Sequence, residues 1–438
     1  MIQNSFYIET YGCASNKADS QIISKILKEN NYIPASFSEA QFIIINTCAV
    51  KQQTENKIRD RLKELHLTFH GSKNKNIIIA GCLPHVGGNY FEVIERLIPD
   101  YSAILDLDNF EEIPSIFEQI KTGKRNLFIP SKKSIDKSEY LINYPEGKLT
   151  GIVPISEGCL GACTYCCVKN ARGRLNCYDP ESIIKNVDYQ LKQGIKQIYL
   201  TSQDCSTYNH GDTTLIDLMR SINNLEFQFF LRMGMLNPRF LIDHYSQLIS
   251  IYGLKKVYQF LHVPIQSGSD DVLKLMNRPY IIGDIREKLK ILRENFPYLT
   301  ISTDIICGFP GENKDDFQDT IEFIEWLKPE ILNISKFTPR PGTKAKKMKQ
   351  VNSKEIKTRS IELSNIFRDS LSNINDKWKN WEGDILALHT GTEKNQTFGR
   401  NFAYKNIFID NFKGKFGTFV KVRINTIDGF NLCAQIID

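Results

Sequence analysis

Residues 154–166 read Pro-Ile-Ser-Glu-Gly-Cys-Leu-Gly-Ala-Cys-Thr-Tyr-Cys, which places cysteines at positions 159, 163 and 166. A short β-branched run at residues 151–155 leads into this stretch. We therefore expect the three thiols in a loop at the carboxyl end of a strand. Cysteine thiolates are the usual ligands of iron–sulfur clusters, so Cys159, Cys163 and Cys166 can hold three corners of a 4Fe–4S cube. The fourth iron of such a cube has no protein ligand and can bind a small molecule.

Two simpler interpretations of these thiols remain, a zinc site and buried free cysteines. Zinc usually takes four ligands from paired clusters, and no second Cys-x2-Cys pair follows downstream. Buried thiols rarely crowd one glycine-rich loop. The pattern therefore favours the cluster. Cys167 directly follows Cys166, and adjacent side chains point apart, so we interpret Cys167 as a bystander.

Three apolar runs in residues 1–125 each lead into a cysteine. Residues 6–8 precede Cys13, residues 42–45 precede Cys48, and residues 77–79 precede Cys82. Helical segments lie between them, near residues 20–29 and 54–65, and this alternation predicts a parallel sheet covered on both faces. Ligands collect at the carboxyl ends of strands in such sheets. We therefore expect a second cluster site with an open iron, although three ordinary core thiols are the alternative.

The rest of the chain divides into a connector and two further domains. Residues 126–148 are polar and typical of a linker. Residues 149–375 alternate strands and helices six times, which predicts a partial (β/α)6 barrel rather than the full eight units. The strands are expected at residues 152–156, 197–202, 229–234, 257–265, 300–308 and 331–337. The helices are expected at residues 180–193, 215–223, 238–251, 282–295 and 314–327.

Residues 376–438 change character and predict a small β-barrel. Short alternating runs at residues 384–389, 402–409, 417–424 and 429–437 are separated by glycine and asparagine, as in small barrels. The fold class is therefore α/β, with an N-terminal parallel α/β sandwich, a central partial barrel and a C-terminal barrel.

Composition excludes several classes of protein. The chain has 438 residues, 41% hydrophobic residues and a net charge of +6, which indicates a globular protein of two or three domains. We expect no signal peptide and no membrane span, and hence a cytoplasmic protein, by default a monomer. Reduced thiols there serve metal binding or catalysis more often than disulfides.

Basic residues form two tracts that permit a nucleic-acid partner. The first runs through residues 336–379, where we expect Phe337, Arg340, Lys346 and Lys347 to face RNA. The second lies in the last domain, where Lys415 and Lys421 alternate with aromatic residues that could stack on bases. A solvated helix face and a structural aromatic core are the alternatives.

The cysteine loop resembles that of the radical S-adenosylmethionine enzymes, in which an aromatic residue such as Tyr165 precedes the third cysteine. The order of domains over essentially the whole chain resembles the methylthiotransferases. The motifs that carry this resemblance are Tyr-Gly-Cys-Ala-Ser-Asn from residue 11, Asn-Thr-Cys-Ala-Val-Lys from residue 46, Ala-Gly-Cys from residue 80 and Thr-Asp-Ile-Ile-Cys-Gly-Phe-Pro-Gly-Glu from residue 303.

Within that family the chain looks most like the archaeal and eukaryotic enzymes that act on N6-threonylcarbamoyladenosine in tRNA. The stretches that point there are residues 162–166, 231–238 and 340–343. The last domain resembles, loosely, the RNA-binding TRAM module. The resemblance implies that the tRNA anticodon stem-loop is the partner and that a methylthio group is added to C2 of the modified adenosine next to the anticodon.

The resemblance also implies the cofactors and the roles of the six cysteines. The cluster on Cys159, Cys163 and Cys166 would bind S-adenosylmethionine and cleave it with one electron from an unknown donor. The cluster on Cys13, Cys48 and Cys82 would supply sulfur, methylated from a second S-adenosylmethionine. The residues expected around the cofactor, besides Tyr165, are Gln203, Asp204, Arg232, Gln266 and Gly308, with Asp304 and Arg278 as weaker candidates.

Three alternatives for the function stay open on the sequence. Two are sister activities, methylthiolation of N6-isopentenyladenosine in tRNA and of a ribosomal-protein aspartate. The third is a non-catalytic iron–sulfur protein that only binds RNA. The cysteines at positions 177, 205, 307 and 433 receive no role.

Overall fold

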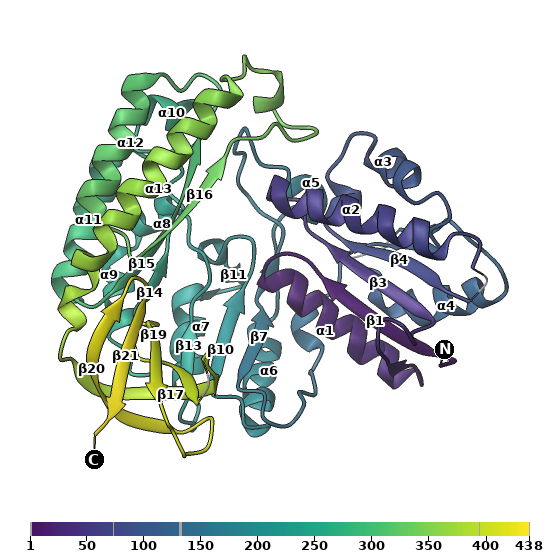
Figure 1. The fold of residues 1–438 in the computed structure, drawn as a ribbon, viewed down its shortest axis with the longest axis horizontal. Coiled ribbons are helices and arrows are strands. Elements are labelled where there is room, and N and C mark those ends of the chain that lie inside the picture. Colours follow the sequence, from purple (N-terminus) through teal and green to yellow (C-terminus); the bar gives the residue numbers. More distant parts are fainter. Residues whose placement is uncertain (1, 73, 131–133, 394, 438) are drawn as a thin grey trace.

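The computed structural model describes residues 2–72, 74–130, 134–393 and 395–437. Three parts follow one another along the chain (Figure 1). An N-terminal α/β sheet lies beside a central partial barrel. Helices lie at the top of the central part in this view, and the small closed barrel of strands lies at its bottom. Within the described ranges, no helix combines the length and the apolar character needed to cross a membrane.

The N-terminal sheet has six parallel strands in the order β2-β1-β3-β4-β5-β6. Its strands are β1 (Ser5–Thr10), β2 (Ile33–Pro34), β3 (Phe42–Thr47), β4 (Asn76–Gly81), β5 (Ala103–Leu105) and β6 (Leu127–Ile129). Its helices are α1 (Ala14–Glu29), α2 (Gln52–Phe69), α3 (Tyr90–Leu97) and α4 (Ile113–Lys121), with the 3-10 turns η1 (Leu83–His85) and η2 (Phe110–Glu112).

Alternate residues of β3 explain why helices cover both faces of this sheet. Ile44 packs with α1 and α4 in one apolar cluster, whereas Ile43 and Ile45 pack with α2 and α3 in another. Every residue of β3 and β4 is buried. The parallel sheet covered on both faces, which the continuous apolar runs predicted, is confirmed.

The connector expected at residues 126–148 is only partly a linker. Its first residues form β6, which pairs with β5 and completes the sheet. Lys137, in the 3-10 turn η3 (Lys137–Glu139), is 2% exposed. The polar composition of this segment therefore reflects buried ion pairs as well as solvent exposure.

The central part has six parallel strands, as the sequence predicted. They are β7 (Thr150–Pro154), β10 (Gln197–Thr201), β13 (Phe230–Arg232), β14 (Phe260–His262), β15 (Thr300–Cys307) and β16 (Ile331–Lys336). They form two three-stranded sheets, β7-β10-β13 and β14-β15-β16, linked by a single bridge between Leu231 and Val257. This open arrangement is the partial barrel.

The helices outside these strands differ from expectation in two places. They are α6 (Pro180–Lys192), α7 (Leu215–Asn223), α8 (Pro238–Asp243), α9 (Tyr245–Tyr252), α10 (Asp270–Leu275), α11 (Ile282–Asn295) and α12 (Lys314–Leu327). The helix expected at residues 238–251 is broken at His244, whose φ of −131° is not helical. The short helix α10, capped by the Ser269 side chain, was not expected.

Short elements surround the cysteine loop and the strand ends. The strand β8 (Ser156–Glu157) pairs with β9 (Asn176–Cys177), and the loop between them carries the helix α5 (Val168–Arg172). The 3-10 turn η4 (Cys205–Thr207) follows β10, and β11 (Asn209–His210) pairs with β12 (Thr213–Thr214). The turn η5 (Ala345–Lys347) precedes α13 (Ser353–Asn375), which lies along α12 and β16 (Figure 1).

After the turn η6 (Asp376–Trp378), the last domain is a closed barrel of five strands, not four. Its strands are β17 (Glu382–Thr390), β18 (Gln396–Arg400), β19 (Asn406–Asp410), β20 (Phe419–Asp428) and β21 (Asn431–Ile436), in the order β17-β18-β19-β21-β20. The strand expected at residues 402–409 begins only at Asn406, and β18 was missed. Leu386 and Leu388 pack against Phe230, Tyr258 and Phe260 and so attach this barrel to the central part.

Candidate functional site

Cys13, Cys48 and Cys82 lie at the carboxyl ends of three neighbouring strands. Cys13 is the N-cap of α1 directly after β1, Cys48 follows β3, and Cys82 starts the turn η1 after β4. Burial raises the pKa of Cys48 and raises that of Cys82 to about 12, and a negative charge on Cys13 adds to both shifts. The three thiols are therefore close enough to act on one another electrostatically.

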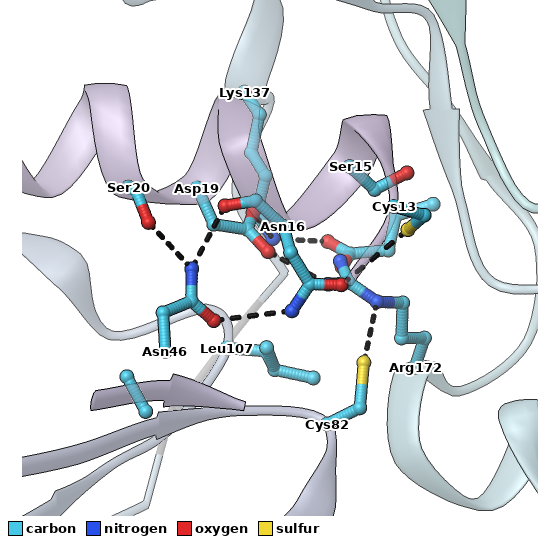
Figure 2. Close-up of polar contacts among 12 residues, drawn as sticks. Cys13, Ser15, Asn16, Asp19, Ser20, Asn46, Cys82, Leu107, Lys137 and Arg172 are labelled. Atoms are coloured by element: carbon cyan, nitrogen blue, oxygen red, sulfur yellow. Dashed lines mark hydrogen bonds and ion pairs between the residues drawn. The ribbon is translucent and has the colours of Figure 1, made fainter. Parts of the chain in front are cut away.

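Gly12 allows this approach. Its φ is +118°, and a Cβ added there would lie 2.7 Å from Cys48 Cβ and 3.1 Å from Cys48 Sγ. Asn16 and Asn46 brace the same edge of the sheet: Asn46 donates to the Asn16 carbonyl at 2.8 Å, and Asn16 donates to the Thr47 carbonyl at 2.7 Å. The Cys13 thiol donates to Asn16 Oδ1 at 3.4 Å (Figure 2).

Cys159, Cys163 and Cys166 share the loop between β8 and β9. Burial raises the pKa of Cys159 and raises that of Cys166 to about 12, with further contributions from a charged Cys163. The Gly161 N–H donates to Cys159 Sγ at 3.2 Å, and Arg278 Nη1 donates to Cys163 Sγ at 3.4 Å. These donors point at the sulfur atoms and are suited to thiolates.

All eleven cysteines are free of disulfides. Among the described residues, only His66, His70 and Asp100 gather ligand atoms closely enough for one ion, within 4.8 Å of one another. The histidine group, at the other end of α2 from Cys48, was not expected.

Arg172 belongs to a buried network of charges beside Cys82. Its Nε donates to Cys82 Sγ at 3.1 Å, Nη2 to Asp19 at 2.7 Å, and Nη1 to Glu157 (Figure 2). Lys137 Nζ lies 3.0 Å from Asp19 and 2.6 Å from Glu157. Burial alone would raise the pKa of Asp19, but the charges of Arg172 and Lys137 outweigh it and lower that pKa.

This network joins all the segments around the cysteines. Asp19 is on α1, Lys137 is in the connector, Glu157 precedes Cys159, and Arg172 ends α5. Cys167, interpreted as a bystander, is buried in the core of the N-terminal sheet, and its thiol donates to the Ala49 carbonyl at 3.6 Å. The cysteine loop of the barrel is thus packed directly against the N-terminal domain.

Gln203 and Asp204 follow β10 beside the cysteine loop. Gln203 accepts from the Gly158 N–H at 2.7 Å and donates to Ser15 Oγ at 3.2 Å. Asp204 is buried, burial raises its pKa, and it accepts from the Ser206 N–H at 3.1 Å. A cavity of about 430 Å³ borders Asp204, Cys163 and Arg278. These residues lie where a small ligand next to Cys163 could be held.

Arg232 and Gln266 lie farther along the barrel. The Arg232 guanidinium is 4.6 Å from the centre of the Phe260 ring and 5.0 Å from that of Tyr404, and its buried Nε has no hydrogen-bond partner. Gln266 is 9% exposed with a φ of +77°, a conformation that is strained for a residue with a side chain. Strain of this kind concentrates at functional sites.

Tyr165 and Gly308 pack against protein rather than opening into a cavity. The Tyr165 ring meets Phe309 edge-on, with centroids 6.3 Å apart. Gly308 has a φ of +75°, its N–H donates to Glu312 at 2.7 Å, and any added Cβ would collide with Ile356 of α13. The close approach of α13 is sufficient to account for this glycine. Asp304, a weaker candidate, accepts from Asn333 at 2.8 Å and lies 3.2 Å from His262 Nε2.

The residues expected to face RNA divide into two groups. Phe337 is 8% exposed and packs on Phe309, and Arg340 is 7% exposed and paired with Glu55 of α2. Neither is therefore free to contact RNA, and the expectation for these two is corrected by their burial. The four lysines of the prediction are exposed: Lys346, Lys347, Lys415 and Lys421.

The four charged residues of the buried network were not predicted from the sequence to have a role. Asp19, Lys137 and Glu157 are ordinary charged residues in their local sequences, and no spacing marks them. Arg172 stands six residues after Cys166 in the chain.

Two family profiles match the chain. The profile of the Radical SAM superfamily matches residues 153–324, and that of uncharacterized protein family UPF0004 matches residues 5–102. The first covers the cysteine loop and most of the barrel strands. The second covers Cys13, Cys48 and Cys82.

Relatives match over almost the full length. The chain is 37% identical over 435 residues to a probable threonylcarbamoyladenosine tRNA methylthiotransferase of Pyrococcus horikoshii, covering 98% of this chain and 99% of that protein. It is 30% identical to the threonylcarbamoyladenosine tRNA methylthiotransferase of Drosophila melanogaster, covering 99% of this chain and 77% of that protein.

Among solved structures, the fold is similar to that of the radical S-adenosylmethionine methyltransferase TsrM from Kitasatospora setae. The TM-score is 0.56 at 12% identity, covering 79% of this chain and 74% of that one. At that identity the likeness concerns the fold alone.

Proposed function

The chain belongs to the family of the threonylcarbamoyladenosine tRNA methylthiotransferases, and from this premise we propose that it adds a methylthio group to C2 of N6-threonylcarbamoyladenosine next to the tRNA anticodon. The family implies S-adenosylmethionine and a 4Fe–4S cluster as cofactors. The observation that carries the proposal is the hydrogen bond from Arg172, in the loop of Cys159, Cys163 and Cys166, to Cys82 of the N-terminal domain. One trio alone would suit many radical enzymes.

Cys159, Cys163 and Cys166 would hold the cluster that binds S-adenosylmethionine. When both are bound, the cluster and S-adenosylmethionine supply the radical chemistry that functionalises a carbon without an acidic proton, such as C2 of adenine. Gln203 fixes the loop by accepting from the Gly158 N–H. Asp204 offers a buried carboxylate beside Cys163. Of the other candidates, Arg232 and Gln266 would contact the cofactor or the substrate. Tyr165 and Gly308 would shape the walls of the cofactor site.

Cys13, Cys48 and Cys82 would hold a second 4Fe–4S cluster that supplies the sulfur, with a second S-adenosylmethionine supplying the methyl group. Their positions at three adjacent strand ends and the space kept open by Gly12 support this. Iron and sulfide analysis of anaerobically purified protein tests it. Two cubes predict about eight irons per chain, and about four would leave the second cluster without support.

The exposed lysines of η5 and of the last barrel are the proposed contacts to the tRNA anticodon stem-loop. A tRNA substrate also favours the cytoplasm as the place of action. We further propose a monomer that takes its electron from a separate reductase.

Mass spectrometry of tRNA nucleosides from a strain lacking this gene tests the function. We expect loss of the 2-methylthio form, with accumulation of plain N6-threonylcarbamoyladenosine. The wild-type gene should restore the product, and the Cys163→Ala gene should not. Unchanged 2-methylthio-N6-threonylcarbamoyladenosine would contradict the proposal.

The other outcomes identify the alternatives. Loss of the methylthio-isopentenyl nucleoside, or of methylthio-aspartate in a ribosomal protein, would assign the chain to a sister activity. A non-catalytic RNA-binding protein would release no 5′-deoxyadenosine when reconstituted and incubated with dithionite and S-adenosylmethionine.

A further inference from the structure

Arg172 belongs to one cysteine loop but contacts a cysteine of the other. It ends α5, in the same loop as Cys159, Cys163 and Cys166, and its Nε donates to Cys82 Sγ at 3.1 Å. Figure 2 shows the guanidinium reaching toward Cys82 from the barrel side while α1 carries Asp19 and Cys13 above it. The contact therefore crosses from the barrel to the N-terminal sheet.

We propose that Arg172 is a positioning residue that ties the two cluster sites together and raises the reduction potential of the cluster on Cys13, Cys48 and Cys82. This inference rests on the proposed second cluster. It concerns how that cluster is tuned and held, not whether it is present.

The guanidinium is held in one orientation. Nη1 is paired with Glu157 and Nη2 with Asp19, and in this orientation Nε points at Cys82. The side chains of Arg172 and Asp19 are 2% and 3% exposed. A planar fork fixed by two carboxylates cannot turn away without breaking buried ion pairs.

Without a cluster, the two carboxylates and the two cations of this network sum to no net charge. The carboxylates of Asp19 and Glu157 face the cations of Lys137 and Arg172, and the Nε–H is left for the sulfur. Hydrogen bonds to cluster sulfurs help to set reduction potentials. Because reduction adds one negative charge, a donor aimed at a cysteine ligand stabilises the reduced form, and burial strengthens the effect.

The other trio has a donor of the same kind, but from its own domain. Arg278 follows α10 in the barrel, and its Nη1 lies 3.4 Å from Cys163 Sγ. Each site therefore has one arginine donating to one cysteine. Of the two arginines, only Arg172 comes from the loop of the other cysteine trio. A change in the separation of the two sites would therefore change the surroundings of Cys82.

Arg172→Lys separates the hydrogen bond from the charge. In lysine a methylene occupies the place of arginine Nε, and the ammonium occupies the place of Cζ, within reach of Asp19 and Glu157. The charge network is kept and the donor to Cys82 is lost. The matched control is Arg174→Lys, because Arg174 is exposed two residues further along the chain.

The potential is measured by redox titration monitored by electron paramagnetic resonance. The full chain carries Cys159→Ala, Cys163→Ala and Cys166→Ala, so that only the second cluster gives a signal. We expect Arg172→Lys to shift its midpoint potential to a lower value and Arg174→Lys to leave it unchanged. An unchanged potential in Arg172→Lys protein with full iron content would overturn the proposal, even if its thermal stability fell, since a purely structural role would affect stability alone.

A second measurement needs no substitution at Arg172. In the same background, protein labelled with ¹⁵N only at arginine should show a nitrogen coupled to the reduced cluster in pulsed resonance spectra. Absence of that coupling in iron-loaded protein would overturn the inference. If the background protein binds no cluster at all, the proposed second cluster fails instead, which is a separate result.

Discussion

The environment of Cys82 and Cys166 has a direct consequence for cluster loading. Burial raises the pKa of Cys82 and of Cys166 to about 12. These thiols are therefore protonated at neutral pH until metal displaces the proton. Arg172 compensates part of the burial of Cys82 by presenting positive charge to its sulfur.

Substitution of single cysteines should separate the two sites. Cys163→Ala should abolish cleavage of S-adenosylmethionine, because Cys163 is a proposed ligand of the cluster that would bind it. Cys48→Ala should leave cleavage largely intact yet stop thiolation, because the cleaving site remains whole. Release of 5′-deoxyadenosine and formation of methylthio product are measured on the same samples.

Cys433→Ala is the matched control, since Cys433 lies in the last barrel on β21. It should alter neither product. Equal loss of cleavage in folded Cys48→Ala and Cys163→Ala proteins would show that the proposed division of labour is wrong.

At the scale of elements, the missed strand β18 shows how tertiary contact overrides a local signal. Its sequence, Gln396–Arg400, contains Gly399, and glycine weakens a strand pattern. In the barrel, a Cβ at Gly399 would lie 2.8 Å from the Leu386 carbonyl of the neighbouring strand. Gly399 therefore makes β18 difficult to predict from the sequence, and its lack of a side chain allows β17 and β18 to approach closely in the barrel.

The turn between β18 and β19 carries a buried lysine that should make stability depend on pH. Lys405 Nζ donates to Asn375 at 2.7 Å, and burial lowers its pKa from 10.5 to about 8. Between those values the unfolded chain binds more protons than the folded one, so stability rises with pH. Below about pH 8 the buried charge costs roughly 3 kcal/mol, at about 1.4 kcal/mol per unit.

Lys405→Met removes this cost. The melting temperature of the variant relative to wild type should therefore be most favourable near pH 7 and less favourable near pH 10. Lys379→Met, at an exposed lysine, provides the control and should show no such trend. If the melting temperatures of Lys405→Met and wild type differ by the same amount at pH 7 and pH 10, Lys405 does not titrate between these pH values.

At the scale of the molecule, the N-terminal domain is fastened to the barrel at several points. Arg340 pairs with Glu55, Arg172 with Asp19, and Ser15 Oγ lies 3.4 Å from Thr201 Oγ1. The first two are buried ion pairs, and loss of one partner from such a pair typically costs about 3–5 kcal/mol. The two cysteine trios are therefore held at one separation by contacts around them.

Binding of tRNA should depend on the exposed lysines at the top of the barrel. The double substitution Lys346→Glu and Lys347→Glu should weaken binding and reduce the slope of log affinity against log salt by roughly one to two units, because phosphate contacts release counterions. Affinity for an anticodon stem-loop is measured over a series of salt concentrations. The control is Lys185→Glu with Lys290→Glu, on the outer helices α6 and α11.

The control pair should leave the slope unchanged. An unaltered slope in the first variant would mean that Lys346 and Lys347 are only a solvated face.

The amino-acid sequence was sufficient to predict that Cys13, Cys48 and Cys82 follow strands of one parallel sheet. Apolar runs of strand length alternating with helical segments are local patterns, and each cysteine follows its run directly, so the positions of Cys13, Cys48, Cys82 and the loop at Cys159 could be predicted. Parallel strands bring their carboxyl ends to one edge, which is a rule of topology and needs no knowledge of packing.

Which charged residues are buried, and what they contact, depends on how the distant segments of the chain pack. Arg340 resembled a surface residue in a basic tract and is buried against Glu55, 285 residues away. Asp19 and Arg172 are 153 residues apart and share a bond of 2.7 Å. An ion pair between such distant segments leaves no periodicity in either one, because its energy depends on the desolvation and geometry that exist only once the two domains have packed together.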